Sequence, residues 1–298
     1  MGLALRSADR SFVPVFDYCR TFGSRKQSLT DRLCSLPCDL KPGSKVIASQ
    51  DLYGATTTLL TTIFGSFGVK TLAVDFSDLS QLRERVKEAS PVVLITETIS
   101  NPLLKVCDIE ACAEIAHAAG AKLIVDNTFA SPYLCQPLKL GADMVVHSAT
   151  KYLSGHADAT GGVVVSRDEF DSAALVGVMK LVGGVLSVWE AHQILRGMKT
   201  LGVRLDRQCD NARTLAERLL TNEQIEKVYY PGLFTGKALE TAQRMLRTEH
   251  PGALVAVELK DNTTEGAFRF MQQLDEDCRR LFARSDCRVD HVSTRALS

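Results

Sequence analysis

Lys151 has the clearest potential for covalent chemistry, because hydroxyl side chains flank it and a carboxylate ends a neighbouring predicted strand. A lysine amine forms a Schiff base with a carbonyl when its surroundings keep it deprotonated. Ser148 and Thr150 flank it with hydroxyls that can donate hydrogen bonds to a phosphate. Asp126 could pair with a protonated ring nitrogen. Tyr53 could stack on the same ring.

This combination would suit pyridoxal 5'-phosphate (PLP), but each residue taken alone is also explained as an ordinary loop residue. Spacing alone leaves both interpretations open. The elements that must position these residues favour the functional one. Short apolar strands alternate with helices, which predicts a mainly parallel α/β sheet covered on both faces. We expect strands at residues 46–48, 69–74, 92–97, 122–126, 143–148 and 162–166.

Polar side chains follow three of these strands at the point where each strand ends. Asp126 closes one strand, Ser148 to Lys151 follow another, and Thr96, Glu97, Ser100 and Asn101 end or follow a third. Because sites in parallel α/β sheets lie at the carboxyl ends of strands, we expect these side chains to meet in one region.

The last third of the chain has a different pattern. Residues 189–220 predict one long helix, bent near Gly202, and a β-α-β-α pattern follows up to residue 274. We therefore expect a large domain over residues 1–205 and a smaller one over residues 206–298. Residues 1–40 and 275–298 are atypical parts of these two domains.

Composition excludes several classes of protein. The formal net charge is zero, so nothing suggests a nucleic-acid partner or an anionic membrane surface. No stretch predicts a membrane span or a secretory signal. The nine cysteines are scattered without a C-x-x-C pair, which favours reduced thiols and a cytoplasmic location. His147, His156 and Asp158 could be read as metal ligands, but we expect no metal site there.

One long segment carries a specific resemblance. It begins Asp126-Asn-Thr-Phe and continues through Gly141-Ala-Asp-Met-Val-Val-His-Ser-Ala-Thr-Lys151 to Asp158. It closely resembles the Cys/Met-metabolism PLP enzymes: cystathionine γ-synthase, cystathionine γ- and β-lyases, methionine γ-lyase and O-acyl-homoserine sulfhydrylases. The resemblance covers roughly residues 40–274. It implies the aspartate-aminotransferase-like (type I) PLP fold.

The resemblance also implies roles for individual residues. Lys151 would carry PLP and move protons, Asp126 would pair with the ring nitrogen, and Ser148 and Thr150 would hold the phosphate. Tyr53 would stack on the ring and assist acid–base steps.

The implied reaction is elimination or replacement at the γ (or β) carbon of cystathionine or homoserine-type substrates. Asn101 would contact the cofactor and the sulfur-containing amino-acid substrate. Ala55 stands where methionine γ-lyases typically have cysteine, which disfavours that specialisation. The assembly implied is a homotetramer, a dimer of dimers with shared active sites.

Both ends depart from the family pattern. The upstream Tyr-Ser-Arg-type and Ser-Gly-Met segments that reach the phosphate are not recognisable in residues 1–40, and residues 275–298 lack the segment with the carboxylate-binding arginine. Two lost phosphate bonds would weaken cofactor binding on the order of 100-fold. Two hypotheses therefore stand: a PLP-dependent carbon–sulfur lyase or synthase of impaired activity, or a non-catalytic truncated homologue that binds PLP weakly or associates with a complete paralogue.

Overall fold

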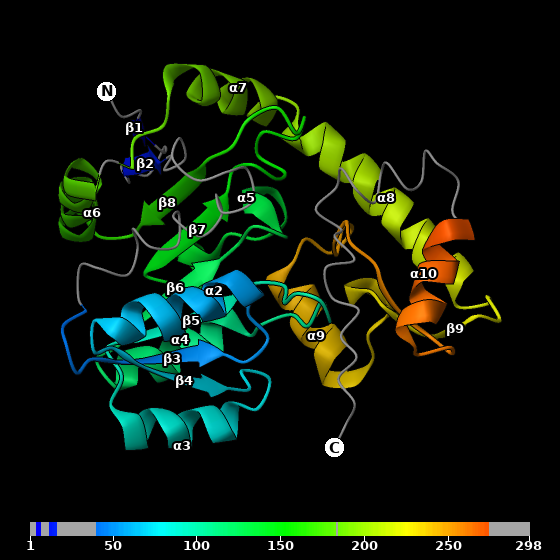
Figure 1. The fold of residues 1–298 in the computed structure, drawn as a ribbon, viewed down its shortest axis with the longest axis horizontal. Helices are drawn as coiled ribbons and strands as arrows, with labels where there is room; N and C mark the ends of the chain where they lie inside the picture. The colour runs from blue at the N-terminus through cyan, green and yellow to red at the C-terminus, as the bar shows by residue number, and fades with distance from the viewer. Residues whose placement is uncertain (1–3, 7–11, 17–39, 183, 274–298) are drawn as a thin grey trace.

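The computed structural model describes residues 4–6, 12–16, 40–182 and 184–273. The expectations about the atypical ends concern residues 1–40 and 275–298, which lie largely outside the described part of the chain. Within the described residues the architecture is α/β, with a large sheet domain and a smaller lobe beside it (Figure 1).

An eight-stranded sheet forms the centre of the large domain, in the order β1-β2-β8-β7-β6-β5-β3-β4. The five strands β3 to β7 run parallel, and β8 pairs antiparallel with both β7 and β2. The predicted mainly parallel sheet is therefore confirmed. The strands are β1 (Ala4–Arg6), β2 (Phe12–Phe16), β3 (Lys45–Ser49), β4 (Lys70–Val74), β5 (Val93–Glu97), β6 (Lys122–Asp126), β7 (Met144–Ser148) and β8 (Gly162–Ser166).

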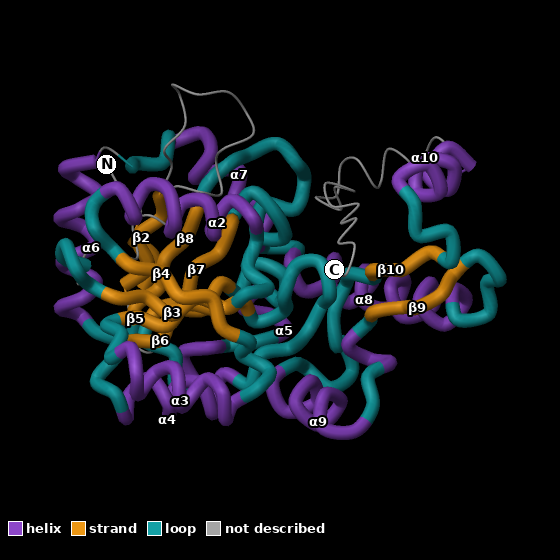
Figure 2. Tube along the Cα trace, turned by 60° about the horizontal axis from the view of Figure 1, so that its bottom comes forward, coloured by secondary structure: helices purple, strands orange, loops and turns teal. Residues whose placement is uncertain are grey.

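Helices cover both faces of the sheet because alternate strand residues are apolar on both sides. In β6, Leu123 and Val125 belong to one buried cluster and Ile124 to the other. The first cluster includes α3 (Leu79–Ala89) and α4 (Ile109–Ala118). The second includes residues of the π-helical segment Leu59–Phe64, which continues α2 (Gly54–Thr58), and of α6 (Glu169–Val182). Figure 2 shows α2 and the α3–α4 pair on opposite sides of the strands.

The expected single helix over residues 189–220 is wrong, because the chain forms two helices there. They are α7 (Val188–Met198) and α8 (Leu201–Leu219). At the break, two side chains donate hydrogen bonds to the carbonyl of Gly197: the Thr200 hydroxyl at 3.1 Å and Arg204 Nη2 at 3.0 Å. The chain therefore turns just before the predicted bend at Gly202.

α8 leads from the large domain into the smaller lobe (Figure 1). The lobe contains an antiparallel pair, β9 (Ile225–Tyr229) and β10 (Ala256–Leu259), with α9 (Gly236–Met245) between them in sequence and α10 (Thr264–Gln273) after them. The predicted β-α-β-α order is confirmed. A boundary at residue 205 would fall inside α8, and this division of the chain stays a prediction.

Short helices complete the connections: α5 (Ser131–Leu134), and 3-10 turns at Pro137–Leu140 and Pro231–Leu233. Among the helices that the structure describes, we find none with the length and apolarity needed to cross a bilayer.

Candidate active site

Three parallel strands end side by side in polar, buried residues. β5 ends at Glu97, β6 at Asp126 and β7 at Ser148, and each is at most 7% exposed. Glu97 and Asp126 are direct register partners. The residues two positions earlier in these strands all pack in the cluster beneath α2. Because strand side chains alternate, Glu97, Asp126 and Ser148 project from that same face.

The backbone fixes the position of the Asp126 carboxylate. The carboxylate Oδ1 accepts a hydrogen bond from the Thr128 N–H at 2.9 Å, and the main-chain carbonyl of Asp126 accepts from the Thr98 N–H at 2.9 Å. A buried carboxylate that is oriented in this way can stabilise a cationic N–H group placed against it. The structure thus places Asp126 where the sequence analysis expects it, at the carboxyl edge of the sheet.

A polar network that the sequence analysis did not assign supports this edge. Thr98 Oγ1 donates to Asn127 Oδ1 at 2.7 Å, and Asn127 Nδ2 donates to the carbonyl of Cys135 at 3.0 Å. The Ser148 N–H donates to Thr128 Oγ1 at 2.8 Å, which joins the ends of β6 and β7. The only sequence signal for these roles is that polar residues follow apolar strands directly.

Lys151 lies on a tight turn directly after β7. Its N–H donates to the Ser148 carbonyl at 3.2 Å, and its own carbonyl accepts from the Gly155 N–H at 2.8 Å. The turn is also anchored by Thr150, whose Oγ1 accepts from the Gly161 N–H at 3.1 Å. The side chain of Lys151 is half-buried. Ser148 and Lys151 are thereby brought together within one loop.

The residues at this edge fit PLP. The decisive observation is Ser148 Oγ, which is buried and has no hydrogen-bond partner within the described part of the chain. A buried hydroxyl without a partner is costly, so it points to an acceptor supplied from outside the chain. A phosphate oxygen is such an acceptor, and the Asp126 carboxylate on the neighbouring strand end suits a ring nitrogen.

Tyr53 and Asn101 lie in segments next to these strand ends. Tyr53 is the N-cap residue of α2, and its N–H donates to Glu97 Oε1 at 3.0 Å. Asn101 lies in the loop after β5 and makes none of the contacts described above. Lys105 in that loop donates to Asp51 Oδ2 at 2.8 Å, which ties the loop to the segment before Tyr53. Burial acts to lower the pKa of Lys105, but its hydrogen bond to Asp51 and the negative charges of Asp51 and Asp75 together outweigh this effect, so the net shift is upward.

His147 lies one residue before Ser148 and is buried. Burial lowers its pKa to about 4, although the nearby Asp126 acts in the opposite direction. The other two residues of the alternative metal interpretation have protein partners: His156 Nδ1 bonds the Ser154 carbonyl at 2.6 Å, and Asp158 Oδ2 accepts from Gln193 at 3.1 Å. Within the described residues no three His, Cys, Asp or Glu side chains are grouped to hold a metal ion.

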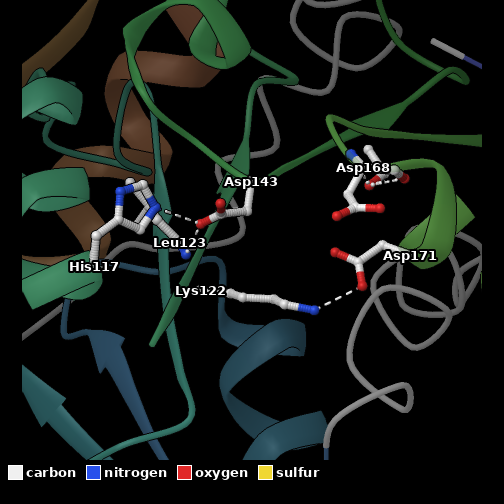
Figure 3. Close-up of polar contacts among 7 residues, drawn as sticks. His117, Lys122, Leu123, Asp143, Asp168 and Asp171 are labelled. Atoms are coloured by element: carbon white, nitrogen blue, oxygen red, sulfur yellow. Dashed lines mark hydrogen bonds and ion pairs between the residues drawn. The ribbon is translucent and has the colours of Figure 1, made fainter. Parts of the chain in front are cut away.

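The opposite, amino edge of the sheet has polar contacts of a different kind (Figure 3). Asp143 Oδ2 accepts from the Leu123 N–H at 2.7 Å and bonds His117 Nε2 at 2.9 Å. Lys122 Nζ donates to Asp171 Oδ1 at 2.7 Å. These pairs join β6 and the start of β7 to α4 and α6. Their partners come from within the chain, so they have a structural role, in contrast to Ser148.

Comparisons with known proteins agree with this geometry. A profile of the family described as Cys/Met metabolism PLP-dependent enzyme matches residues 18–276. The match begins at residue 18, upstream of residue 40, and the resemblance seen in the sequence begins only at about residue 40. Among solved structures, a cystathionine gamma synthase from Xanthomonas oryzae pv. oryzae in complex with cystathionine superimposes with a TM-score of 0.80 at 32% identity, covering 88% of this chain and 64% of that one.

Curated relatives belong to the same group of enzymes. An L-methionine gamma-lyase from Fusobacterium nucleatum is 44% identical over 76% of this chain, and a cystathionine gamma-synthase from Mycobacterium leprae is 40% identical over 72%. The chain spans 57% and 55% of the length of these two relatives. The profile match, the structural likeness and the strand-end lysine, aspartate and serine lead to one conclusion: the chain belongs to the Cys/Met metabolism PLP-dependent enzyme family.

Proposed function

We propose that this protein is a PLP-dependent carbon–sulfur lyase or synthase that acts at the γ (or β) carbon of cystathionine or homoserine-type amino acids. The observation that carries the proposal is the arrangement at the carboxyl edge of the sheet. A buried carboxylate and a buried hydroxyl, which has no partner among the described residues, lie at two neighbouring strand ends, and a half-buried lysine lies in the loop directly after the second strand.

PLP, when bound, supplies a carbonyl that takes up an amine and a ring that withdraws electrons from the amino-acid α-carbon. In this proposal, Lys151 Nζ would hold the cofactor, and the Lys151 amine would be the base that removes the α-proton of the substrate. Its place on the turn directly after β7 ties it to the strand end that carries Ser148.

The neighbouring residues hold and orient the cofactor. Asp126 keeps the ring nitrogen protonated through its charge, and Ser148 and Thr150 donate to the phosphate. The Thr150 hydroxyl also accepts from Gly161, so its backbone turn is fixed before any ligand arrives. Tyr53 covers the ring and assists proton transfer, and Asn101 contacts cofactor and substrate.

The substrate assignment rests on a single position. Ala55 follows Tyr53 and Gly54 at the start of α2, where methionine γ-lyases typically have cysteine. This residue supports cystathionine or homoserine-type substrates over methionine. The relatives do not support this preference, because they include L-methionine gamma-lyases as well as a cystathionine gamma-synthase. A substrate panel decides between them.

Catalysis is favoured over the alternative of a non-catalytic homologue. The relatives are enzymes, and the matched range includes the lysine, aspartate and serine of the strand-end site.

We further propose a homo-oligomer of the dimer-of-dimers type. Exposed apolar side chains around the start of α7 support it, since Val188 and Trp189 are 83% and 68% exposed. The described cysteines, which are free, support a reducing, cytoplasmic location.

Purified protein tests the proposal directly. With PLP added, it should gain a visible absorbance band, and Lys151→Ala should lose that band. Turnover is then measured with cystathionine, an O-acyl-homoserine plus a thiol, and methionine, by following the 2-oxo acid or the new thioether. We expect cystathionine or the homoserine ester to be used in preference to methionine. Protein that gains no visible band with PLP would refute the proposal.

A further inference from the structure

Glu97 is a buried acid next to the proposed cofactor site, and neither the fold nor the proposed chemistry accounts for it so far. It ends β5, is 7% exposed and lies in register with Asp126 on the neighbouring strand. Burying a carboxylate is costly unless hydrogen bonds compensate it. A carboxylate at this position therefore needs a specific reason.

One hydrogen bond of the Glu97 carboxylate joins it to the main chain at the start of α2. Its Oε1 accepts from the N–H of Tyr53 at 3.0 Å, a bond between residues 44 positions apart. Tyr53 is the N-cap of α2, with φ −50° and ψ 128°, and its side chain makes no capping hydrogen bond to this helix. The carbonyl of Tyr53 accepts from the Thr56 N–H at 2.8 Å, which begins the helix. The Glu97 bond thus fixes the residue from which α2 starts.

The surroundings make this fixing effective. Leu52 and Thr56, on either side of Tyr53, are 6% and 2% exposed, whereas Tyr53 itself is only partly buried. Buried neighbours and one charge-assisted bond hold the backbone of Tyr53.

We propose that Glu97 is a positioning residue, which holds the main chain of Tyr53 so that the tyrosine ring covers the cofactor site beside Asp126. The inference rests on the proposed function, because it needs PLP at that edge. A competing explanation is that the charge of Glu97 acts directly on Asp126, since adjacent register partners on one sheet face lie about 5 Å apart. The two explanations predict different effects of a neutral acceptor.

Glu97→Gln and Glu97→Ala separate these explanations. Glutamine keeps an oxygen that can accept from the Tyr53 N–H but removes the charge, whereas alanine removes both. We expect Glu97→Ala to raise the Kd for PLP about tenfold, and Glu97→Gln to stay within about threefold of the wild type, as one charge-assisted bond implies. The visible circular dichroism band of bound PLP should change in Glu97→Ala alone. Glu88→Gln, at an exposed position of α3, is the matched control and should change neither quantity.

A double-mutant cycle with Tyr53→Ala shows whether Glu97 acts through the ring. The backbone bond survives in Tyr53→Ala, but there is no ring to position, so adding Glu97→Ala should then change the Kd less than about threefold. Melting temperatures of all variants identify any that fail to fold. If Glu97→Ala fails to fold, Glu97→Gln is compared with the wild type in its place.

Three results would overturn the inference: wild-type affinity in a folded Glu97→Ala, equal losses in Glu97→Gln and Glu97→Ala, or a full Glu97→Ala effect in the Tyr53→Ala background. Wild-type protein that binds no PLP would instead refute the proposed function, and with it the inference.

Discussion

Ser148→Ala should have opposite effects on the cofactor-free and the PLP-bound protein. In the cofactor-free protein the Ser148 hydroxyl is buried and has no hydrogen-bond partner in the described residues. Alanine removes that hydroxyl and leaves the surrounding backbone bonds in place, including the one from the Ser148 N–H to Thr128. The substitution therefore relieves an unfavourable group in one state and deletes a cofactor contact in the other.

The magnitudes follow from general hydrogen-bond energies. A buried, unsatisfied hydroxyl costs about 1–3 kcal/mol, so the free energy of unfolding of the cofactor-free variant should stay equal or rise by about 1 kcal/mol. A bond from the hydroxyl to a charged phosphate is worth about 1.5–3 kcal/mol, so the Kd for PLP should rise about 10- to 150-fold.

Ser166→Ala is a matched control within the same sheet. Ser166 is also buried, but its hydroxyl donates to the Asp168 carbonyl and accepts from the Asp168 N–H, both at 3.1 Å. It pairs with Met144 at the amino edge of the sheet, away from Lys151. We expect it to lower stability by about 1 kcal/mol and to leave the Kd for PLP unchanged.

Urea unfolding without PLP and fluorescence titration with PLP measure the two quantities for each variant. The reasoning would be refuted if Ser148→Ala destabilised the cofactor-free protein as much as Ser166→Ala does. It would also be refuted if the Kd for PLP of Ser148→Ala matched that of the wild type.

Two further predictions concern stability. His147 has a pKa of about 4 in the native protein against 6.5 as its ordinary value, so the unfolded chain binds the extra proton and stability falls as the pH decreases through this window. Urea unfolding should show a loss of about 2 kcal/mol between pH 7 and pH 5 from this group, and His147→Leu should reduce that loss; an unchanged pH dependence would contradict it. A Cβ on Gly197 would lie 1.9 Å from the Ser154 carbonyl oxygen, so Gly197→Ala should lower the melting temperature by several degrees, whereas Gly177→Ala, with open space around it, should be neutral or slightly stabilising. Equal melting temperatures for the two glycine variants would refute this packing argument.

The central sheet could be predicted from the sequence because its signals are local. The sequence predicts a strand at residues 122–126, the bounds that β6 has, since a short apolar run ending in Asp126 has few other interpretations. In contrast, the sequence pattern does not predict β2. Its sequence, Phe-Val-Pro-Val-Phe, contains a proline, and its partners in β8 lie far along the chain, as in the pair Val15 and Val163.

The site residues likewise could be predicted where their sequence signals are local. Lys151, Asp126 and Ser148 are at or directly after strand ends that the apolar pattern defines, so the sequence predicts their grouping. It does not predict the contact between Glu97 and Tyr53, because this contact joins the end of one strand to the start of a helix that precedes it by 44 residues. No sequence pattern encodes which strand-end acid accepts from which helix start.

The most direct test of the account is to locate the residue that carries PLP. The purified protein is incubated with PLP, reduced with borohydride to make the link permanent, digested and mapped by mass spectrometry. The account predicts that the pyridoxyl group is found on the peptide containing Lys151, and that the Lys151→Ala protein carries none at a stoichiometric level. Stoichiometric label on another lysine, or no label on the wild-type protein, would contradict it.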